Sequence, residues 1–252
     1  MTLLLLPFIK RHGSYYPNPR QPLISFHTQQ PKSHPNISTI KTLVQGGHFI
    51  QALQHYTNLW NNGHKPDNFT FPYILKASSQ LPHPTIGLSI HSHAIKTGFH
   101  TDLFVGNSLI LFYARFGYLD IMHRLFDEIP QKNIVTWTAI ISAYSQNGQF
   151  SYAIELFHGM LVADVRPNSF TMAVILGGLC CNQGAMQIHG FMIKCGFESD
   201  VIISTALIDS YAKCGNAKFA CGCFSEMTQR NLVSWNAMIS GFNRSGNTQA
   251  AL

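Results

Sequence analysis

The chain has 252 residues, of which 46% are hydrophobic and only 11% are charged, and its formal net charge is +6. A charged fraction well below the quarter typical of soluble domains argues against one large globule and favours small units that bury surface against one another. The apolar run Leu3–Ile9 is too short to span a bilayer, and no run of about 18 apolar residues follows it, so no transmembrane helix is predicted.

The N-terminal segment is basic and contains no acidic residue before Asp67. Arginine, serine and apolar residues without acids are typical of organellar transit peptides, so residues 1–32 are predicted to be one and to lack ordered structure. A mitochondrion is the favoured destination and a chloroplast is the alternative. A secretory signal fits less well, because nothing basic precedes the leucine run and no small-residue cleavage site follows it.

A repeat with more than one length runs through the rest of the chain. Ser108–Asp120 and Ala206–Lys218 contain nearly the same phrase 98 residues apart, and Trp137 and Trp235 are separated by the same distance. Equivalent phrases close on Gly47, Gly117, Gly148, Gly215 and Gly246, so intervals of 70 and 67 residues alternate with intervals of 31. Self-similarity of this kind indicates stacked repeat units.

Two short helices are predicted in each unit, as residues 134–168 illustrate. The first has apolar residues at i, i+3, i+4 and i+7 and is followed by Gly148, which accommodates a left-handed turn. The second has the same pattern and stops before Pro167. The apolar positions are Trp137, Ile140, Ile141 and Tyr144, then Ala153, Leu156, Phe157 and Met160. Helices this short are marginal alone, so stacked helix pairs, an all-α solenoid, are predicted.

These phrases resemble the pentatricopeptide repeat (PPR) proteins of plants, and in particular their PLS subclass, in which units of about 35, 35 and 31 residues alternate. The resemblance implies a right-handed α-solenoid (superhelix) of about six and a half two-helix repeats. The implied units are residues 33–67, 68–102, 103–133, 134–168, 169–200, 201–231 and a partial unit 232–252. Tetratricopeptide repeats would instead keep a uniform 34 residues.

The resemblance also implies binding of single-stranded organellar RNA, with one base read per repeat. The implied base-reading residues are Asn107, Asn133, Thr138, Asn168, Thr205, Asn231 and Asn236. The implied base-stacking residues are Phe104, Val135, Ile202 and Val233.

The reading residues act in pairs, each made of a polar residue early in the first helix and the last residue of the same unit. Asn107 with Asn133 resembles pairs that favour a pyrimidine. Thr138 with Asn168, and Thr205 with Asn231, resemble pairs that favour adenine, and Asn236 alone leans to a pyrimidine. The long units offer Pro72 with Asp102 and Ala173 with Asp200, and they are assigned no base because Pro and Ala side chains cannot hydrogen-bond.

Helix capping is the alternative explanation of these residues. Asn and Asp that precede a helix are ordinary N-caps, and that role alone accounts for the last residue of each unit. The two roles are compatible, since one oxygen can cap the helix while another group faces a base.

The sequence predicts a reader without catalytic activity. Proteins of the PLS subclass are similar to specificity factors of C-to-U RNA editing, whose zinc deaminase chemistry needs H-x-E and P-C-x-x-C, and neither motif occurs in this chain. No cofactor, metal, membrane or small-molecule substrate is expected. The predicted partners are single-stranded RNA and an editing or deaminase protein. The alternatives are a protein-binding solenoid without an RNA role and a truncated, non-functional product, because the pattern stops at Leu252 partway through a unit.

Overall fold

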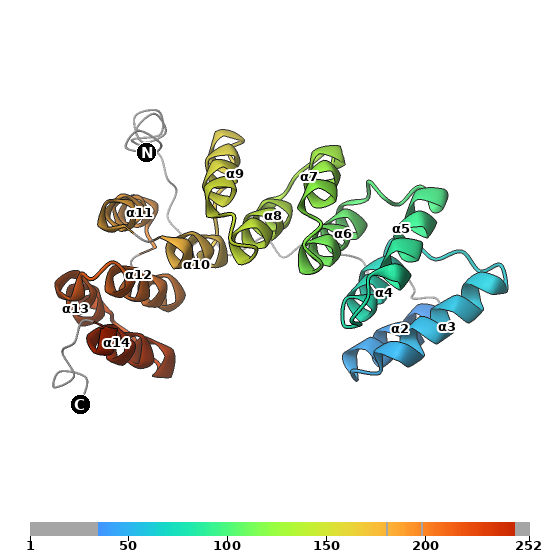
Figure 1. The fold of residues 1–252 in the computed structure, drawn as a ribbon, viewed down its shortest axis with the longest axis horizontal. Coiled ribbons are helices and arrows are strands. Elements are labelled where there is room, and N and C mark those ends of the chain that lie inside the picture. The colour runs from blue at the N-terminus through green and yellow to red at the C-terminus, as the bar shows by residue number, and fades with distance from the viewer. Residues whose placement is uncertain (1–34, 180, 198, 245–252) are drawn as a thin grey trace. The chain divides into compact units, whose positions relative to one another are not determined.

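The computed structural model describes residues 35–179, 181–197 and 199–244, and these form thirteen α-helices and no strand (Figure 1). The all-α fold class predicted from the sequence is confirmed for this part of the chain. The transit peptide expected over residues 1–32 lies outside the described residues. None of the described helices is long and apolar enough to cross a bilayer.

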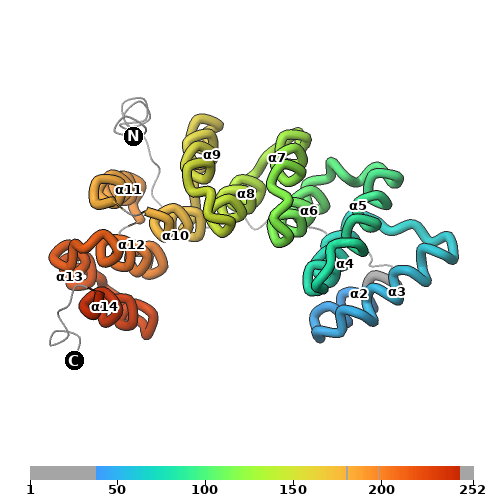
Figure 2. The backbone as a smooth tube through the Cα atoms, viewed as in Figure 1, coloured from blue at the N-terminus to red at the C-terminus, as the bar shows by residue number. Residues whose placement is uncertain are grey.

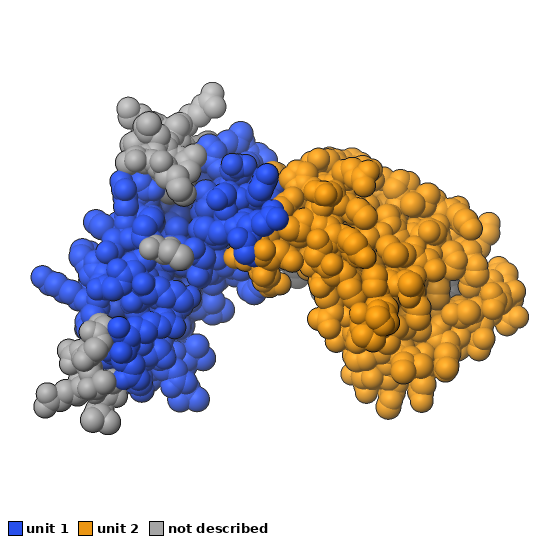
Figure 3. Space-filling view, in the orientation of Figure 1, with its two compact units in different colours: residues 1–23, 148–252 blue, residues 24–147 orange. Residues whose placement is uncertain are grey.

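The chain divides into two units, which Figure 3 shows in different colours. Of the described residues, those up to 147 make up the N-terminal unit and those from 148 onward make up the C-terminal unit. The helices of the N-terminal unit are α2 (Pro35–Gln45), α3 (Phe49–Asn61), α4 (Thr70–Ser78), α5 (Thr85–Thr97), α6 (Leu103–Arg115), α7 (Leu119–Glu128) and α8 (Ile134–Gln146). Those of the C-terminal unit are α9 (Phe150–Val162), α10 (Ser169–Gly178), α11 (Asn182–Cys195), α12 (Val201–Lys213), α13 (Ala217–Glu226) and α14 (Leu232–Arg244).

In both units the helices form hairpins whose first members stack side by side (Figure 2). In the N-terminal unit α4 packs between α2 and α6, and α6 packs between α4 and α8, while α3, α5 and α7 each pack against the first helix of their own hairpin. In the C-terminal unit α12 packs between α10 and α14, and α11 and α13 both pack against it. We call α2, α4, α6, α8, α10, α12 and α14 the first helices, and the others the second helices.

Glycine closes several of the turns that follow a first helix. The backbone of Gly148 has φ +75°, and glycines at equivalent turns, among them Gly117 and Gly215, have the same value. This is the left-handed region that side chains disfavour and that glycine enters without a steric cost. The prediction that Gly148 permits a left-handed turn is therefore confirmed.

The core lies mainly in the first helices, because α4, α6 and α12 each have another first helix on both sides. On α6 the buried residues include Leu109, Ile110, Phe112 and Tyr113, which point in several directions around the helix. In the second helix α9 only one stripe of side chains along the helix is buried. Burying one such apolar side chain contributes about 1.5–3 kcal/mol, so a single hairpin has too little enclosed surface to be stable without its neighbours.

Candidate RNA interface

Each first helix from α4 to α14 follows an Asp or Asn whose side-chain oxygen caps it. In the N-terminal unit, Asp102 Oδ1 accepts hydrogen bonds from the backbone N–H groups of Phe104 (2.9 Å) and Val105 (3.2 Å). Asn133 Oδ1 accepts from the N–H groups of Val135 and Thr136, both at 3.0 Å. These bonds satisfy amide groups that would otherwise lack partners at the start of the helix. Capping, the alternative drawn from the sequence, is therefore a real role of these residues.

The C-terminal unit repeats the arrangement. Asn168 Oδ1 accepts from the N–H of Thr171 (2.8 Å), and Asn231 Oδ1 accepts from the N–H of Ser234 (2.9 Å). Asp200 Oδ1 caps α12 by accepting hydrogen bonds from the backbone N–H groups of Ile202 and Ile203. Among the described residues, the amide nitrogens of Asn133, Asn168 and Asn231 make no hydrogen bond of their own, and all three side chains are exposed. The oxygen of each side-chain amide thus caps a helix, while the two N–H donors of the same amide remain available.

An exposed apolar side chain follows each of these caps by two positions. The four predicted stacking residues Phe104, Val135, Ile202 and Val233 are 54–61% exposed, although most other apolar side chains of α6, α8 and α12 are buried. Exposing a large apolar group costs free energy unless a partner covers it, so a recurring exposed residue at one helical position indicates a contact surface.

The predicted polar readers stand three residues further along the same helices, at the spacing that places two side chains on one face. Asn107 on α6 and Thr205 on α12 are half-buried. Asn107 Oδ1 and Thr205 Oγ1 are buried and have no hydrogen-bond partner among the described residues. Thr138 on α8 is more deeply buried, at 8% exposure, whereas Asn236 on α14 is exposed. A buried oxygen without a partner is costly, so these side chains would gain a hydrogen bond from a ligand donor if they turned toward it, and they would lose none in exchange.

Two aromatic residues in this register were missed by the sequence analysis. Phe69 and Phe170 follow Asp67 and Asn168 by the same two positions and are 41% and 57% exposed. The rings of Phe69 and Phe104 lie 6.2 Å apart within the N-terminal unit. Their register was visible in the sequence, but both belong to long units, to which no base had been assigned.

Cationic side chains in the last turns of the first helices, at the ends opposite the caps, are only partly free. On α12, Lys213 forms an ion pair with Asp209 (2.6 Å), and Arg244 of α14 reaches the same carboxylate (3.1 Å). Lys76, on α4, is exposed. The described residues contain no group of three or more His, Cys, Asp or Glu side chains that could hold a metal ion.

Stacked helical hairpins with a polar and apolar register repeated on their first helices define a helical-repeat protein. The PPR repeat family matches residues 132–181, and the PPR repeat matches residues 107–134, 202–232 and 233–252, which between them cover half of the chain. The chain therefore belongs to the pentatricopeptide repeat family, as its phrases suggested. Membership of this family of helical binding repeats agrees with the prediction that the chain is not an enzyme.

Similar proteins come from Arabidopsis thaliana. The chain is 37% identical over 228 residues to pentatricopeptide repeat-containing protein At3g12770, covering 88% of this chain and 33% of that protein. It is 33% identical to the chloroplastic protein At4g25270, covering 83% and 40% of the two chains, and 35% identical to the mitochondrial protein At1g77170, covering 81% and 44%. The chain thus spans less than half the length of these relatives.

A solved structure has the same fold. The crystal structure of the pentatricopeptide repeat protein PPR10 in complex with an 18-nt psaJ RNA element matches 88% of this chain and 37% of its own, with a TM-score of 0.52 and 18% sequence identity. At this identity the likeness supports the fold, and the all-α repeat class predicted from the sequence is confirmed.

Proposed function

We propose that this chain binds single-stranded RNA in an organelle and recognises its sequence, as the site-recognition part of a C-to-U editing factor or of another RNA-processing factor. One observation carries the proposal: from α4 to α14 each first helix has an Asp or Asn cap followed two positions later by an exposed apolar side chain, and in α6, α8, α12 and α14 a polar side chain stands three residues further on. An apolar side chain can pack on the face of a base, and paired donors and acceptors can contact its edge.

The proposed assignment of bases follows the pairs derived from the sequence and the repeat boundaries given there. Residues 103–133 would read a pyrimidine through Asn107 and Asn133, and residues 201–231 would read adenine through Thr205 and Asn231. The sequence also predicts that residues 134–168 read another adenine. The PLS alternation of unit lengths, and the order pyrimidine, adenine, unread base, adenine, pyrimidine from 5′ to 3′, belong to the same proposal.

The organelle and the downstream enzyme are part of the proposal too. Relatives carry both chloroplastic and mitochondrial names, and the acid-free segment 1–32 has the composition of a transit peptide. PPR10 was crystallised with RNA. Because the deaminase motifs H-x-E and P-C-x-x-C do not occur in this sequence, deamination would be carried out by a partner protein or by a part of the protein outside this sequence.

A gel shift at fixed salt tests RNA recognition. One RNA contains the series pyrimidine-A-x-A, and a second has both adenines changed to cytosine. Polar readout predicts binding that is about 10-fold or more weaker for the second RNA, because contacts to two bases are lost. Equal binding of both RNAs would refute base reading. Constant ionic strength is essential, because phosphate contacts make affinity strongly salt-dependent.

A protein-binding scaffold is the second candidate, and one feature of the C-terminal unit favours it. On α14, Leu232, Trp235 and Ile239 are 76%, 53% and 40% exposed and lie on neighbouring turns of the helix. Such an apolar face suits a protein partner. The gel shift separates the candidates, since a scaffold alone would bind neither RNA.

A further inference from the structure

Two repeat units end in an aspartate whose two carboxylate oxygens both accept hydrogen bonds. In the N-terminal unit, Asp102 uses Oδ1 to cap α6, and its Oδ2 accepts a hydrogen bond from Asn68 Nδ2 at 3.2 Å. In the C-terminal unit, Asp200 uses Oδ1 to cap α12, and its Oδ2 accepts a hydrogen bond from Ser169 Oγ. Asn68 and Ser169 are the first residues of the same two units, 68–102 and 169–200, that end in these aspartates.

The units that end in asparagine have no such contact. Asn133, Asn168 and Asn231 close units whose first residues are Leu103, Ile134 and Val201, and these three side chains have no hydrogen-bonding group. A polar first residue therefore occurs together with a terminal aspartate, and an apolar first residue with a terminal asparagine that keeps its amide donors available.

We propose that Asn68 and Ser169 are specificity-determining residues that keep the two long units from reading a base, by pairing with the second oxygen of Asp102 and Asp200 and so reducing what that oxygen gains from a base. The inference rests on the proposed function, because it concerns which units contribute to base recognition. In these two repeat units the place of the polar reader in the first helix is taken by Pro72 and Ala173, whose side chains cannot hydrogen-bond. The terminal aspartate is therefore the polar group left to contact a base. A carboxylate already paired with a neighbouring donor gains little by exchanging it for another.

The chemistry of a freed aspartate predicts which bases it would select. A carboxylate only accepts hydrogen bonds. Uracil and guanine present a ring N–H donor on their pairing edge, whereas cytosine and adenine present a ring nitrogen acceptor at the same place. Removing the hydroxyl of Ser169 should therefore give residues 169–200 a preference for uracil or guanine.

The experiment measures equilibrium binding, by fluorescence anisotropy, of the full chain to RNAs that vary only at one nucleotide. That nucleotide lies opposite residues 169–200 and is followed by adenine opposite residues 201–231. The proteins are the wild type, Ser169→Ala, Ser169→Thr, which keeps a hydroxyl, and Ser225→Ala, which loses an exposed hydroxyl bonded only within α13. We expect the wild type, Ser169→Thr and Ser225→Ala to bind all four RNAs within about 2-fold, and Ser169→Ala to prefer uracil or guanine over adenine by about 3- to 10-fold. Asn68→Ala should act likewise at the nucleotide opposite residues 68–102.

A preference ratio separates specificity from damage to the fold, because a structural defect would weaken all four RNAs alike. Ser169→Ala that remains indifferent to the varied base would overturn the inference, as would a wild type that already discriminates there. The neighbouring adenine provides the control for the proposed function. One outcome is that binding is lost when this adenine is replaced by cytosine, while Ser169→Ala shows no preference at the varied nucleotide. That outcome would remove the inference and leave the proposed function standing. Indifference at both nucleotides in every protein would overturn both.

Discussion

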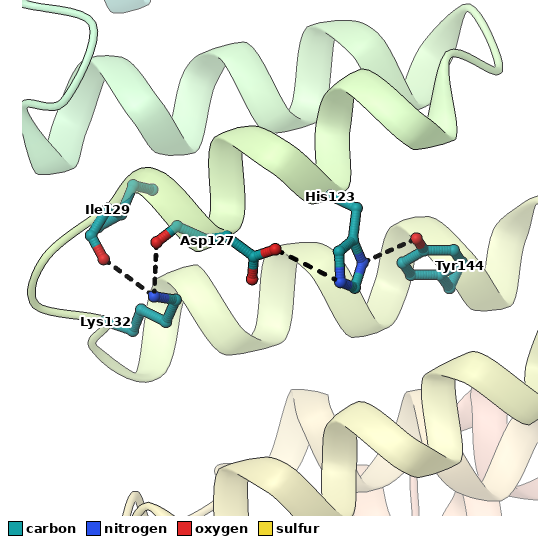
Figure 4. Close-up of polar contacts among 5 residues, drawn as sticks. All are labelled: His123, Asp127, Ile129, Lys132 and Tyr144. Carbon is teal, nitrogen blue, oxygen red and sulfur yellow. Dashed lines mark hydrogen bonds and ion pairs between the residues drawn. The ribbon is translucent and has the colours of Figure 1, made fainter.

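The imidazole of His123 on α7 contacts the phenol of Tyr144 on α8, with 2.9 Å between Nδ1 and the hydroxyl oxygen (Figure 4). The other ring nitrogen, Nε2, faces a carboxylate oxygen of Asp127 at 3.9 Å. A proton on Nε2 suits that carboxylate, which leaves Nδ1 to accept the tyrosine O–H. The same contact joins a second helix to the next first helix twice more, between His91 and Tyr113 (2.6 Å) and between His189 and Tyr211 (3.0 Å).

Removing this hydroxyl should weaken the stacking of adjacent hairpins without affecting RNA specificity. Tyr144→Phe is expected to lower the free energy of unfolding by about 0.5–1.5 kcal/mol, the usual contribution of one hydrogen bond, and to leave the ratio of affinities for matched and mismatched RNA unchanged. Urea unfolding followed by circular dichroism measures the first quantity. Tyr118→Phe is the control, because among the described residues the Tyr118 hydroxyl has no hydrogen bond, and its effect should stay within about 0.5 kcal/mol. Equal destabilisation by both variants would show that the His–Tyr contact has no special weight.

Acid should destabilise the N-terminal unit through His91. Burial, with a smaller effect of His100, lowers the pKa of His91 below 6.5, and Glu128 on α7 acts in the opposite direction. The unfolded chain then binds the proton more readily than the folded one, so stability is fully present above about pH 6.5 and falls as the pH drops below it. Urea unfolding at pH 7.5 and pH 5.5 should show a lower midpoint at pH 5.5. His91→Gln should reduce that difference, and an unchanged difference in this variant would exclude His91 as its source.

Exchanging asparagine for aspartate separates base reading from helix capping. Asn231→Asp keeps an oxygen for the N–H of Ser234, and aspartate caps helices as well as asparagine does, so unfolding should change by no more than about 0.5 kcal/mol. The exchange replaces the amide donors with an acceptor, and the preference for adenine opposite residues 201–231 should fall by about 3- to 10-fold.

The matched control for this exchange is Asn216→Asp. Asn216 caps the second helix α13 through the N–H of Phe219 and stands outside the proposed reading register. Its exchange should leave RNA preference unaltered. A loss of preference in both variants, or in neither, would assign Asn231 to capping alone.

Exposed apolar residues of the first helices should contribute affinity without specificity. Ile202 on α12 is 59% exposed, and Ile193 on the second helix α11 is similarly exposed at 52%. Ile202→Ala is expected to weaken binding to every RNA by about 3- to 10-fold, because every base has a face on which an apolar side chain can pack. Ile193→Ala should leave binding unchanged. The measurement is the dissociation constant of each variant for a matched and a mismatched RNA, and equal effects of the two variants would contradict the stacking role.

Much of the fold was accessible from the sequence because helix formation is local. The i, i+3, i+4, i+7 spacing of Trp137, Ile140, Ile141 and Tyr144 identified a buried helix face, and all four are buried in α8. The pattern understated the burial, since every residue from Thr136 to Tyr144 is enclosed. A first helix has neighbours on several sides, and a periodicity argument that assumes a single apolar face cannot anticipate this.

The polar details depend on contacts between hairpins, and the sequence alone could not supply them. Capping by Asn133 was foreseeable, because it involves only the residues that follow it. The contacts of Asn68 with Asp102 and of His123 with Tyr144 join helices of different hairpins, and their geometry exists only after stacking. The burial of Thr138 was missed for the same reason. The base-reading roles themselves stay predictions.

A specificity swap at one residue tests the central claim most directly. Thr205→Asn gives residues 201–231 the Asn and Asn pair found in residues 103–133, which is proposed to favour a pyrimidine. Binding of the wild type and the variant is measured with two RNAs that differ only in adenine or cytosine opposite residues 201–231. The proposed readout predicts that the wild type prefers adenine and that the variant prefers cytosine, each by about 3-fold or more. The same order of affinities in both proteins would contradict it.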